Sequence, residues 1–142
     1  MECRKKAMDL LARREHSRLE LERKLTSRDY EAEEINATIE QLVADNLQSD
    51  SRFSEAYVQS RINKGFGPVK IRIELQDRGV SDALIEESLS VHADSWVELA
   101  INQQQKKFRT KPDDFTERAR QSRFLQNRGF SVEQIQSVLK SV

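Results

Sequence analysis

The 142-residue sequence contains few of the residues that mark turns, and few aromatic residues. It has four glycines and two prolines, and 6% of its residues are aromatic. A β-sandwich would use more turn residues and more β-branched runs. A charged fraction of 34% is instead typical of a solvated helical protein, so the composition predicts an all-α fold.

The sequence also lacks a cysteine framework and a long apolar run. The only cysteine, Cys3, excludes an intramolecular disulfide and a thiolate zinc cluster, and it is predicted to lie near an exposed terminus. No apolar run approaches the roughly 18 residues that cross a bilayer, and the first residues lack the apolar segment of a secretory signal. We expect a soluble, cytoplasmic protein without membrane contact.

Net charge is absent too, because 24 basic residues are matched by 24 acidic ones. Strong, indiscriminate binding to nucleic acid normally depends on a basic excess. The balance argues against such binding, and we expect only weak direct contact with free DNA.

Catalytic and cofactor motifs are missing. The two histidines, His16 and His92, have no cysteine or carboxylate at metal-ligand spacing. Gly65-Phe66-Gly67-Pro68 is rich in glycine but lacks the lysine and the serine or threonine of a phosphate-binding loop. We therefore expect no enzyme activity, cofactor or metal, and we predict that His16 packs or hydrogen-bonds beside a helix cap.

What the sequence does contain is a repeat with a period of fifty residues. Four columns of apolar residues recur at this spacing: Leu25, Leu75 and Leu125; Tyr30, Val80 and Phe130; Ile35, Ile85 and Ile135; Ile39, Leu89 and Leu139. Such self-similarity indicates tandem units that bury their apolar faces on one another. We predict three tandem three-helix repeats, at residues 1–48, 49–93 and 94–142, stacked into an elongated curved array.

Helix signals within each repeat predict nine helices. Three residue pairs have capping-box spacing: Ser17 with Glu20, Ser95 with Glu98, and Ser131 with Gln134. The other predicted helix starts are Asp29 and Ser81 as N-caps, Pro68 in a first turn, and a start near Asp113 or Asp114. Gly79 and Gly129 follow helices where a left-handed residue is favoured. The apolar stripe predicted for the third helix is Ile35, Ile39, Leu42 and Val43.

The segment from Val69 to Leu75 is the one place where the pattern is ambiguous. Its apolar and charged residues alternate, which by itself favours a strand. The equivalent segment of the third repeat, residues 116–125, does not alternate, and that of the first repeat begins with a capping box. Helix is the only state consistent with all three copies.

With these residues laid out, the sequence resembles the RecX family over nearly its whole length. The most specific matching segment is Lys64-Gly65-Phe66-Gly67-Pro68. Other matching segments include Arg14-Glu15-His16-Ser17, Asp50-Ser51-Arg52-Phe53, Arg78-Gly79, Arg123-Phe124-Leu125 and Arg128-Gly129-Phe130. The resemblance implies a monomeric regulator that binds the RecA recombinase filament on single-stranded DNA. It implies suppression of ATP hydrolysis and strand exchange, and so a role in recombination, DNA repair and the SOS response.

Basic residues of the middle repeat are the candidate partner-binding site: Arg61, Lys64, Lys70, Arg72 and Arg78. Arg61, Lys64 and Arg72 are predicted to face outward together if Ile71 and Leu75 face the core. The alternative is an ordinary solvated surface. A second candidate patch comprises Arg118, Arg120, Arg123 and the basic connection before Pro112, whereas Trp96, Phe108, Phe124 and Phe130 are predicted to be core residues. A helical nucleic-acid-binding module remains the alternative function.

Overall fold

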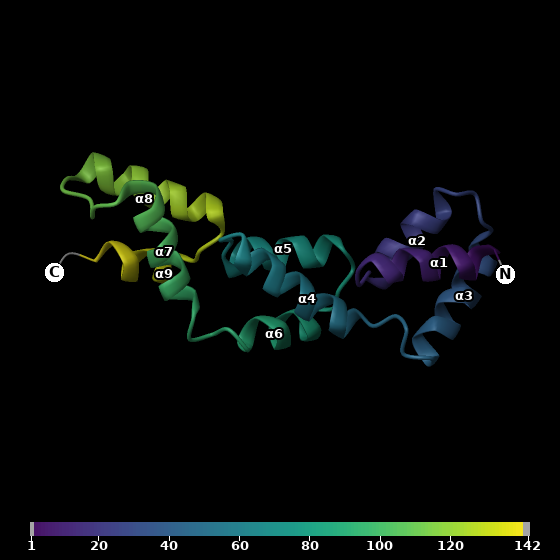
Figure 1. The fold of residues 1–142 in the computed structure, drawn as a ribbon. Helices are drawn as coiled ribbons and strands as arrows, with labels where there is room; N and C mark the ends of the chain where they lie inside the picture. The colour runs from purple at the N-terminus through teal and green to yellow at the C-terminus, as the bar shows by residue number, and fades with distance from the viewer. Residues whose placement is uncertain (1, 141–142) are drawn as a thin grey trace. The chain divides into compact units, whose positions relative to one another are not determined.

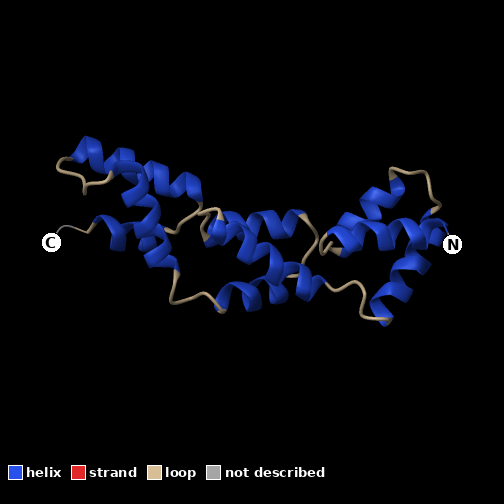
Figure 2. Ribbon diagram, viewed as in Figure 1, coloured by secondary structure: helices blue, strands red, loops and turns tan. Residues whose placement is uncertain are grey.

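The computed structural model describes residues 2–140, and the regular structure of this range is helical throughout. Figures 1 and 2 show helices joined by short connections, without a strand in the described chain. The helices are α1 (Glu2–Arg13), α2 (Arg18–Thr26), α3 (Ala32–Ala44), α4 (Asp50–Asn63), α5 (Pro68–Asp77), α6 (Asp82–Ser90), α7 (Trp96–Phe108), α8 (Phe115–Arg128) and α9 (Val132–Leu139). The all-helical prediction is confirmed, and the ambiguous segment 69–75 lies within α5.

The chain divides into two compact units. The first unit comprises Met1–Tyr57 and Leu75–Ile85, and the second comprises Val58–Glu74 and Glu86–Val142, each as far as the chain is described. The boundaries fall inside α4, α5 and α6, so each middle helix contributes residues to both units.

The four apolar columns are the interior positions of the fold. Leu25, Leu75 and Leu125 are fully buried, and every other column residue except Tyr30 is at most 6% exposed. Tyr30 is half-buried and packs against the core of the first repeat. Burial of equivalent positions fifty residues apart is what the repeat predicts, because each copy turns the same face inward.

Left-handed residues also recur at this spacing. Gly79 has φ of 78° and Gly129 has φ of 100°, as predicted. Asp29, the equivalent residue of the first repeat, has φ of 67°. The prediction that Asp29 caps α3 is therefore wrong. Asp29 follows α2 in the same left-handed conformation that the glycines adopt, which aspartate tolerates better than most residues.

Most of the other predicted caps are found. Ser17 and Ser131 form full capping boxes, and Asp114 accepts from the Glu117 amide at the start of α8. Ser81 accepts from the Leu84 amide at 3.3 Å. The predicted box at Ser95 is wrong, because this residue has φ of −109° and ψ of −11° and makes no side-chain cap bond. A cap requires extended backbone at this position.

Two predictions about individual core positions also need correction. Cys3 is fully buried in α1, where it packs in the core of the first repeat, so its thiol does not lie at an exposed terminus. Val43 is 41% exposed, and Thr38 takes the fourth buried position of α3. Thr38 lies three residues after Ile35 and four before Leu42, so it shares their helical face.

The second unit combines an apolar core with a buried polar pair. Its core includes Leu125 and Phe130. Gln104 of α7 donates to the side-chain oxygen of Gln121 on α8 at 2.9 Å, and both side-chain amides donate to the Thr110 carbonyl, at 2.8 and 3.2 Å. Because buried amide groups need such partners, this arrangement fixes the basic connection between the two helices.

Candidate partner-binding surface

The surface that carries most of the predicted residues is built where two glycines meet. The Gly67 amide donates to the Arg128 carbonyl at 2.8 Å, and the Val69 amide donates to the Gly129 carbonyl at 2.9 Å. A Cβ at Gly67 would lie 2.6 Å from the Gly129 backbone, and one at Gly129 would lie 2.4 Å from the Lys70 Cβ. Only residues without a side chain permit this approach of the α5 start to the α8 end.

Phe66, between Gly65 and Gly67, is the centre of a cluster of cations. The guanidinium carbon of Arg61 lies 3.9 Å from its ring centroid, that of Arg128 lies 5.0 Å away, and the Lys70 ammonium lies 5.3 Å away. These distances are within the range of cation–π attraction. Phe66 is not among the site residues predicted from the sequence, although it stands between basic residues at an interhelical turn.

Arg61 is held by a carboxylate as well as by Phe66. Two of its nitrogens donate to the two carboxylate oxygens of Glu74, both at 2.9 Å. The side chains are 18% and 20% exposed, so this bidentate pair is partly shielded from water. Arg61 thus joins α4 to α5, a structural role that the sequence prediction did not include.

The remaining basic residues on this side of the second unit differ in their surroundings. Arg72 forms a bidentate contact with Glu86 at a more exposed site, with side-chain exposures of 40% and 53%. Lys64 is exposed, and its carbonyl accepts from Arg128 at 3.4 Å. Ile71 and Leu75 are fully buried, as the outward orientation requires. Two of the three cations predicted to face outward are nevertheless paired with carboxylates.

Arg78 belongs to the first unit and contacts residues there. Its guanidinium carbon lies 4.8 Å from the Tyr57 ring centroid, and its Nε lies 3.6 Å from a carboxylate oxygen of Glu20. Its carbonyl accepts the Ser17 hydroxyl at 2.8 Å. These contacts connect the end of α5 to the cap of α2. Which of the five predicted residues contact a partner stays a prediction.

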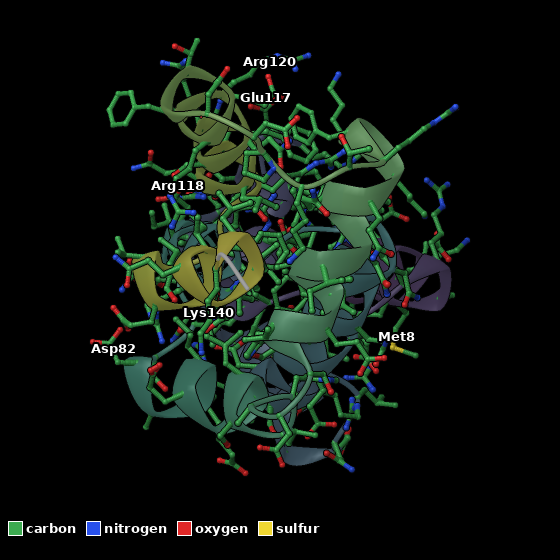
Figure 3. All side chains as sticks on the ribbon, turned by 90° about the vertical axis from the view of Figure 1, so that its left-hand side faces the viewer. Met8, Asp82, Glu117, Arg118, Arg120 and Lys140 are labelled. Atoms are coloured by element: carbon green, nitrogen blue, oxygen red, sulfur yellow. The ribbon has the colours of Figure 1, made fainter. Side chains whose placement is uncertain are left out.

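The second candidate patch is only partly available to a partner. Arg118 donates to the Leu139 carbonyl and Lys111 donates to the Val138 carbonyl, so both bind the last turn of α9. Figure 3 shows Arg120 beside Glu117 at the start of α8, and the two form an ion pair at 3.0 Å. Arg123 lies exposed on the same helix.

His16 has the hydrogen-bonding role that the sequence predicted. It is buried, its Nδ1 lies 3.1 Å from the Arg14 carbonyl, and its Nε2 lies 2.8 Å from the Lys24 ammonium. Because a carbonyl and an ammonium fix the donor and the acceptor, Nδ1 carries the proton and Nε2 accepts. Burial lowers the pKa of His16, and the charges of Arg14 and Lys24 lower it further.

Glu20 lies in the same cluster and keeps its negative charge. Burial alone would raise its pKa, but hydrogen bonds from Arg14 and from the Ser17 amide outweigh burial and lower the pKa. The carboxylate completes the capping box at the start of α2. These titratable groups therefore support a helix end.

Sites of other kinds are not evident in the part of the chain that the structure describes. No group of three or more His, Cys, Asp or Glu residues within 2–140 is placed to hold a metal ion. Across the same range, no helix is both long enough and apolar enough to span a membrane.

These features define an all-helical protein with fifty-residue internal similarity and a cluster of cations around an aromatic residue. The chain belongs to the RecX family of regulatory proteins. Residues 3–42, 49–89 and 94–139 match, in order, the first, second and third three-helix domains of RecX.

Similar proteins agree with this assignment. The chain is 46% identical over 137 residues to the regulatory protein RecX of Pseudomonas savastanoi pv. phaseolicola, covering 96% of this chain and 88% of that protein. It is 41% identical over 133 residues to the RecX of Chromohalobacter salexigens, covering 94% and 88%. The crystal structure of RecX from Lactobacillus salivarius has the same fold, with a TM-score of 0.84 at 24% identity over 98% of this chain and 93% of that one.

Proposed function

We propose that this chain is a negative regulator of homologous recombination that binds the RecA filament on single-stranded DNA. In this role it inhibits ATP hydrolysis and strand exchange by the filament, and so modulates DNA repair and the SOS response in the cytoplasm. It acts as a monomer by binding alone, without catalytic chemistry of its own. The observation that supports the proposal most is membership of the RecX family across all three segments.

We propose that the chain consists of three structural repeats, at residues 1–48, 49–93 and 94–142. The three family matches fall within these limits, which supports the division.

We also propose that five basic residues contact the partner: Arg61, Lys64, Lys70, Arg72 and Arg78. The cation cluster around Phe66 supports this assignment, because a partner with acidic groups would meet several positive charges at once.

The test is ATP hydrolysis by purified recombinase on single-stranded DNA while the chain is added. We expect hydrolysis to fall with increasing concentration of the chain. A variant with Arg61→Gln, Lys64→Gln and Arg72→Gln should inhibit less while keeping its helical circular dichroism. Neutral replacements are preferable to charge reversal, because a carboxylate at position 61 would face Glu74. Lys5→Gln, at an exposed position of α1, is the matched control.

The assay tests the proposed function and the proposed contact residues separately. Unchanged ATP hydrolysis at saturating wild-type chain would refute the proposed function. Full inhibition by the triple variant would leave the function standing and remove these three residues from the contact surface.

Direct binding to DNA is the alternative function, and salt dependence distinguishes it. If single-stranded DNA were the main target, the chain would bind it tightly without recombinase, and the logarithm of affinity would fall with the logarithm of salt by about 0.7 per phosphate contacted. Since the net charge is zero, we expect weak binding to DNA alone.

A further inference from the structure

The second unit contains a concavity in which basic side chains gather. Its volume is about 370 Å³, and the ends of α4, α7 and α8 surround it. Its cations are Lys64, Lys106, Lys107 and Arg128, with Phe124 and the side-chain amides of Asn63 and Gln103 beside them. We refer to this concavity as the basic pocket. It joins a residue of the predicted surface, Lys64, to two residues of the basic connection.

The basic pocket has no carboxylate to balance these charges. No acidic residue lines it, and within residues 2–140 none of its four cations forms an ion pair. Elsewhere in the described chain, arginines such as Arg52, Arg61 and Arg72 have carboxylate partners. Four cations without a carboxylate partner therefore line one concavity.

Helix dipoles offset only part of this positive charge. α4 ends at Asn63, α7 at Phe108 and α8 at Arg128, so three helix C-termini lie at or close to the basic pocket. Each C-terminus is equivalent to about −0.5 charge, which gives about −1.5 in total against four positive charges. A net charge of about +2.5 remains, which two carboxylates would largely neutralise.

The side chain of one cation in the basic pocket, Arg128, is held in place by neighbouring residues. The Arg128 guanidinium carbon lies 5.0 Å from the Phe66 ring centroid and 5.6 Å from that of Phe124, and the side chain donates to the Lys64 carbonyl. A guanidinium fixed in this way loses little side-chain entropy when it binds an anion. The Lys107 ammonium lies 5.9 Å from the Phe124 centroid and adds a charge on an exposed side chain.

The aromatic residues do not favour a nucleic-acid strand. Cations lie over the rings of Phe66 and Phe124, and Phe108 meets Phe124 edge to face at a centroid distance of 5.3 Å. Base stacking on aromatic rings supplies much of the affinity for single strands. A strand that continued past Phe66 would also meet Arg61, whose guanidinium is already paired with Glu74.

The side-chain amides favour a peptide. Asn63 accepts from Gln59 at 2.9 Å through its Oδ1, which leaves its NH₂ group as a donor at the rim. The Gln103 amide offers a donor and an acceptor beside Gly65. These groups complement the carbonyl and amide groups of a peptide backbone.

We propose that the basic pocket binds an acidic peptide segment of a protein partner, with two neighbouring carboxylates placed among Lys64, Lys107 and Arg128. This inference goes beyond the proposed function, because it stands on the basic pocket alone and is tested without recombinase.

The test uses fluorescence anisotropy of a labelled, amidated Gly-Gly-Glu-Glu-Gly-Gly peptide with the full chain. The same peptide with glutamines and a labelled thymidine hexanucleotide are the comparison probes. We expect the glutamate peptide to bind more tightly than either of them. An exposed ion pair contributes up to about fivefold in affinity, so the double variant Lys64→Gln, Lys107→Gln should weaken binding by about 2- to 25-fold. Lys5→Gln should bind as the wild type does.

Each possible result either supports or overturns binding of an acidic peptide by the basic pocket. Selective binding of the glutamate peptide that weakens in the double variant supports it. Equal or tighter binding of the hexanucleotide, absence of peptide binding, or unchanged binding by the double variant would overturn it. Circular dichroism of the double variant shows whether the fold is retained, and both lysines are exposed, so we expect no loss of helix.

Discussion

Replacing Gly129 by alanine tests the contact on which the partner-binding surface depends. Gly129 has φ of 100° and ψ of 19°, and a Cβ there would lie 2.4 Å from the Lys70 Cβ and 2.9 Å from the Lys70 amide nitrogen. Neither atom can move without moving the start of α5. The substitution therefore combines backbone strain with a collision between two helix ends.

The expected magnitude is the sum of these two effects. A left-handed alanine costs about 1–2 kcal/mol, and an added methyl group in a packed site costs about 1–3 kcal/mol. Alanine also restricts the unfolded chain, which offsets roughly 0.4–1 kcal/mol. We expect Gly129→Ala to lower the free energy of unfolding by about 1–4.5 kcal/mol, compared with the 5–15 kcal/mol typical of a domain.

Urea unfolding followed by circular dichroism measures this change. Asn127→Ala, at an exposed position of the same helix, is the control and should change stability by less than about 0.5 kcal/mol. Gly129→Asn separates the two effects, because asparagine tolerates the left-handed conformation but still carries a Cβ. Similar losses for alanine and asparagine would identify the collision as the main effect. A loss below about 0.5 kcal/mol for Gly129→Ala would refute the reasoning.

Three further predictions concern other parts of the chain. Ser17→Ala should destabilise more than Ser131→Ala in urea unfolding, because each loses a cap worth about 1 kcal/mol and Ser17 also donates to the Arg78 carbonyl; equal losses would contradict this. The pKa of His16 is lowered in the folded state, so the unfolded chain binds the proton first as the pH falls. The free energy of unfolding should therefore decrease as the pH drops below the ordinary histidine pKa of 6.5, and His16→Gln should remove this contribution in urea unfolding. Phe66→Leu should keep the helical content but weaken the inhibition of recombinase ATP hydrolysis, because leucine fills the space without attracting cations; inhibition equal to that of the wild type would exclude a role for the ring.

The period of fifty residues predicted more of the fold than the individual helix signals did. Alternation in Val69–Leu75 favoured a strand, and only comparison of the three copies identified α5 as a helix. The same comparison would have placed Asp29 with Gly79 and Gly129, which all have positive φ. Local capping preference instead assigned Asp29 to the wrong role. At Ser95 the preceding hydrogen-bonded turn, with the Ser95 amide donating to the His92 carbonyl, prevents the extended backbone that a cap needs.

The candidate site was less predictable because its contacts join distant segments. Basic residues of the middle repeat are visible in the sequence, but the pairing of Arg61 with Glu74 depends on how α4 packs against α5. Arg128 reaches Phe66 across more than sixty residues of sequence only because Gly67 and Gly129 allow their backbones to meet. Periodicity finds equivalent positions, whereas these contacts join positions that are not equivalent.

Arginine and lysine make different contacts in the described part of this chain. Within residues 2–140, the ion pairs that the structure forms all use arginine, and none uses lysine. A planar guanidinium binds a carboxylate through two hydrogen bonds, whereas an ammonium group is a strongly hydrated point charge. Arginines such as Arg61 therefore stabilise helix packing, so replacing them lowers the stability of the fold as well as removing surface charge. Exposed lysines such as Lys64 and Lys107 contribute charge with little packing, so their replacement isolates the contribution of electrostatics to partner binding.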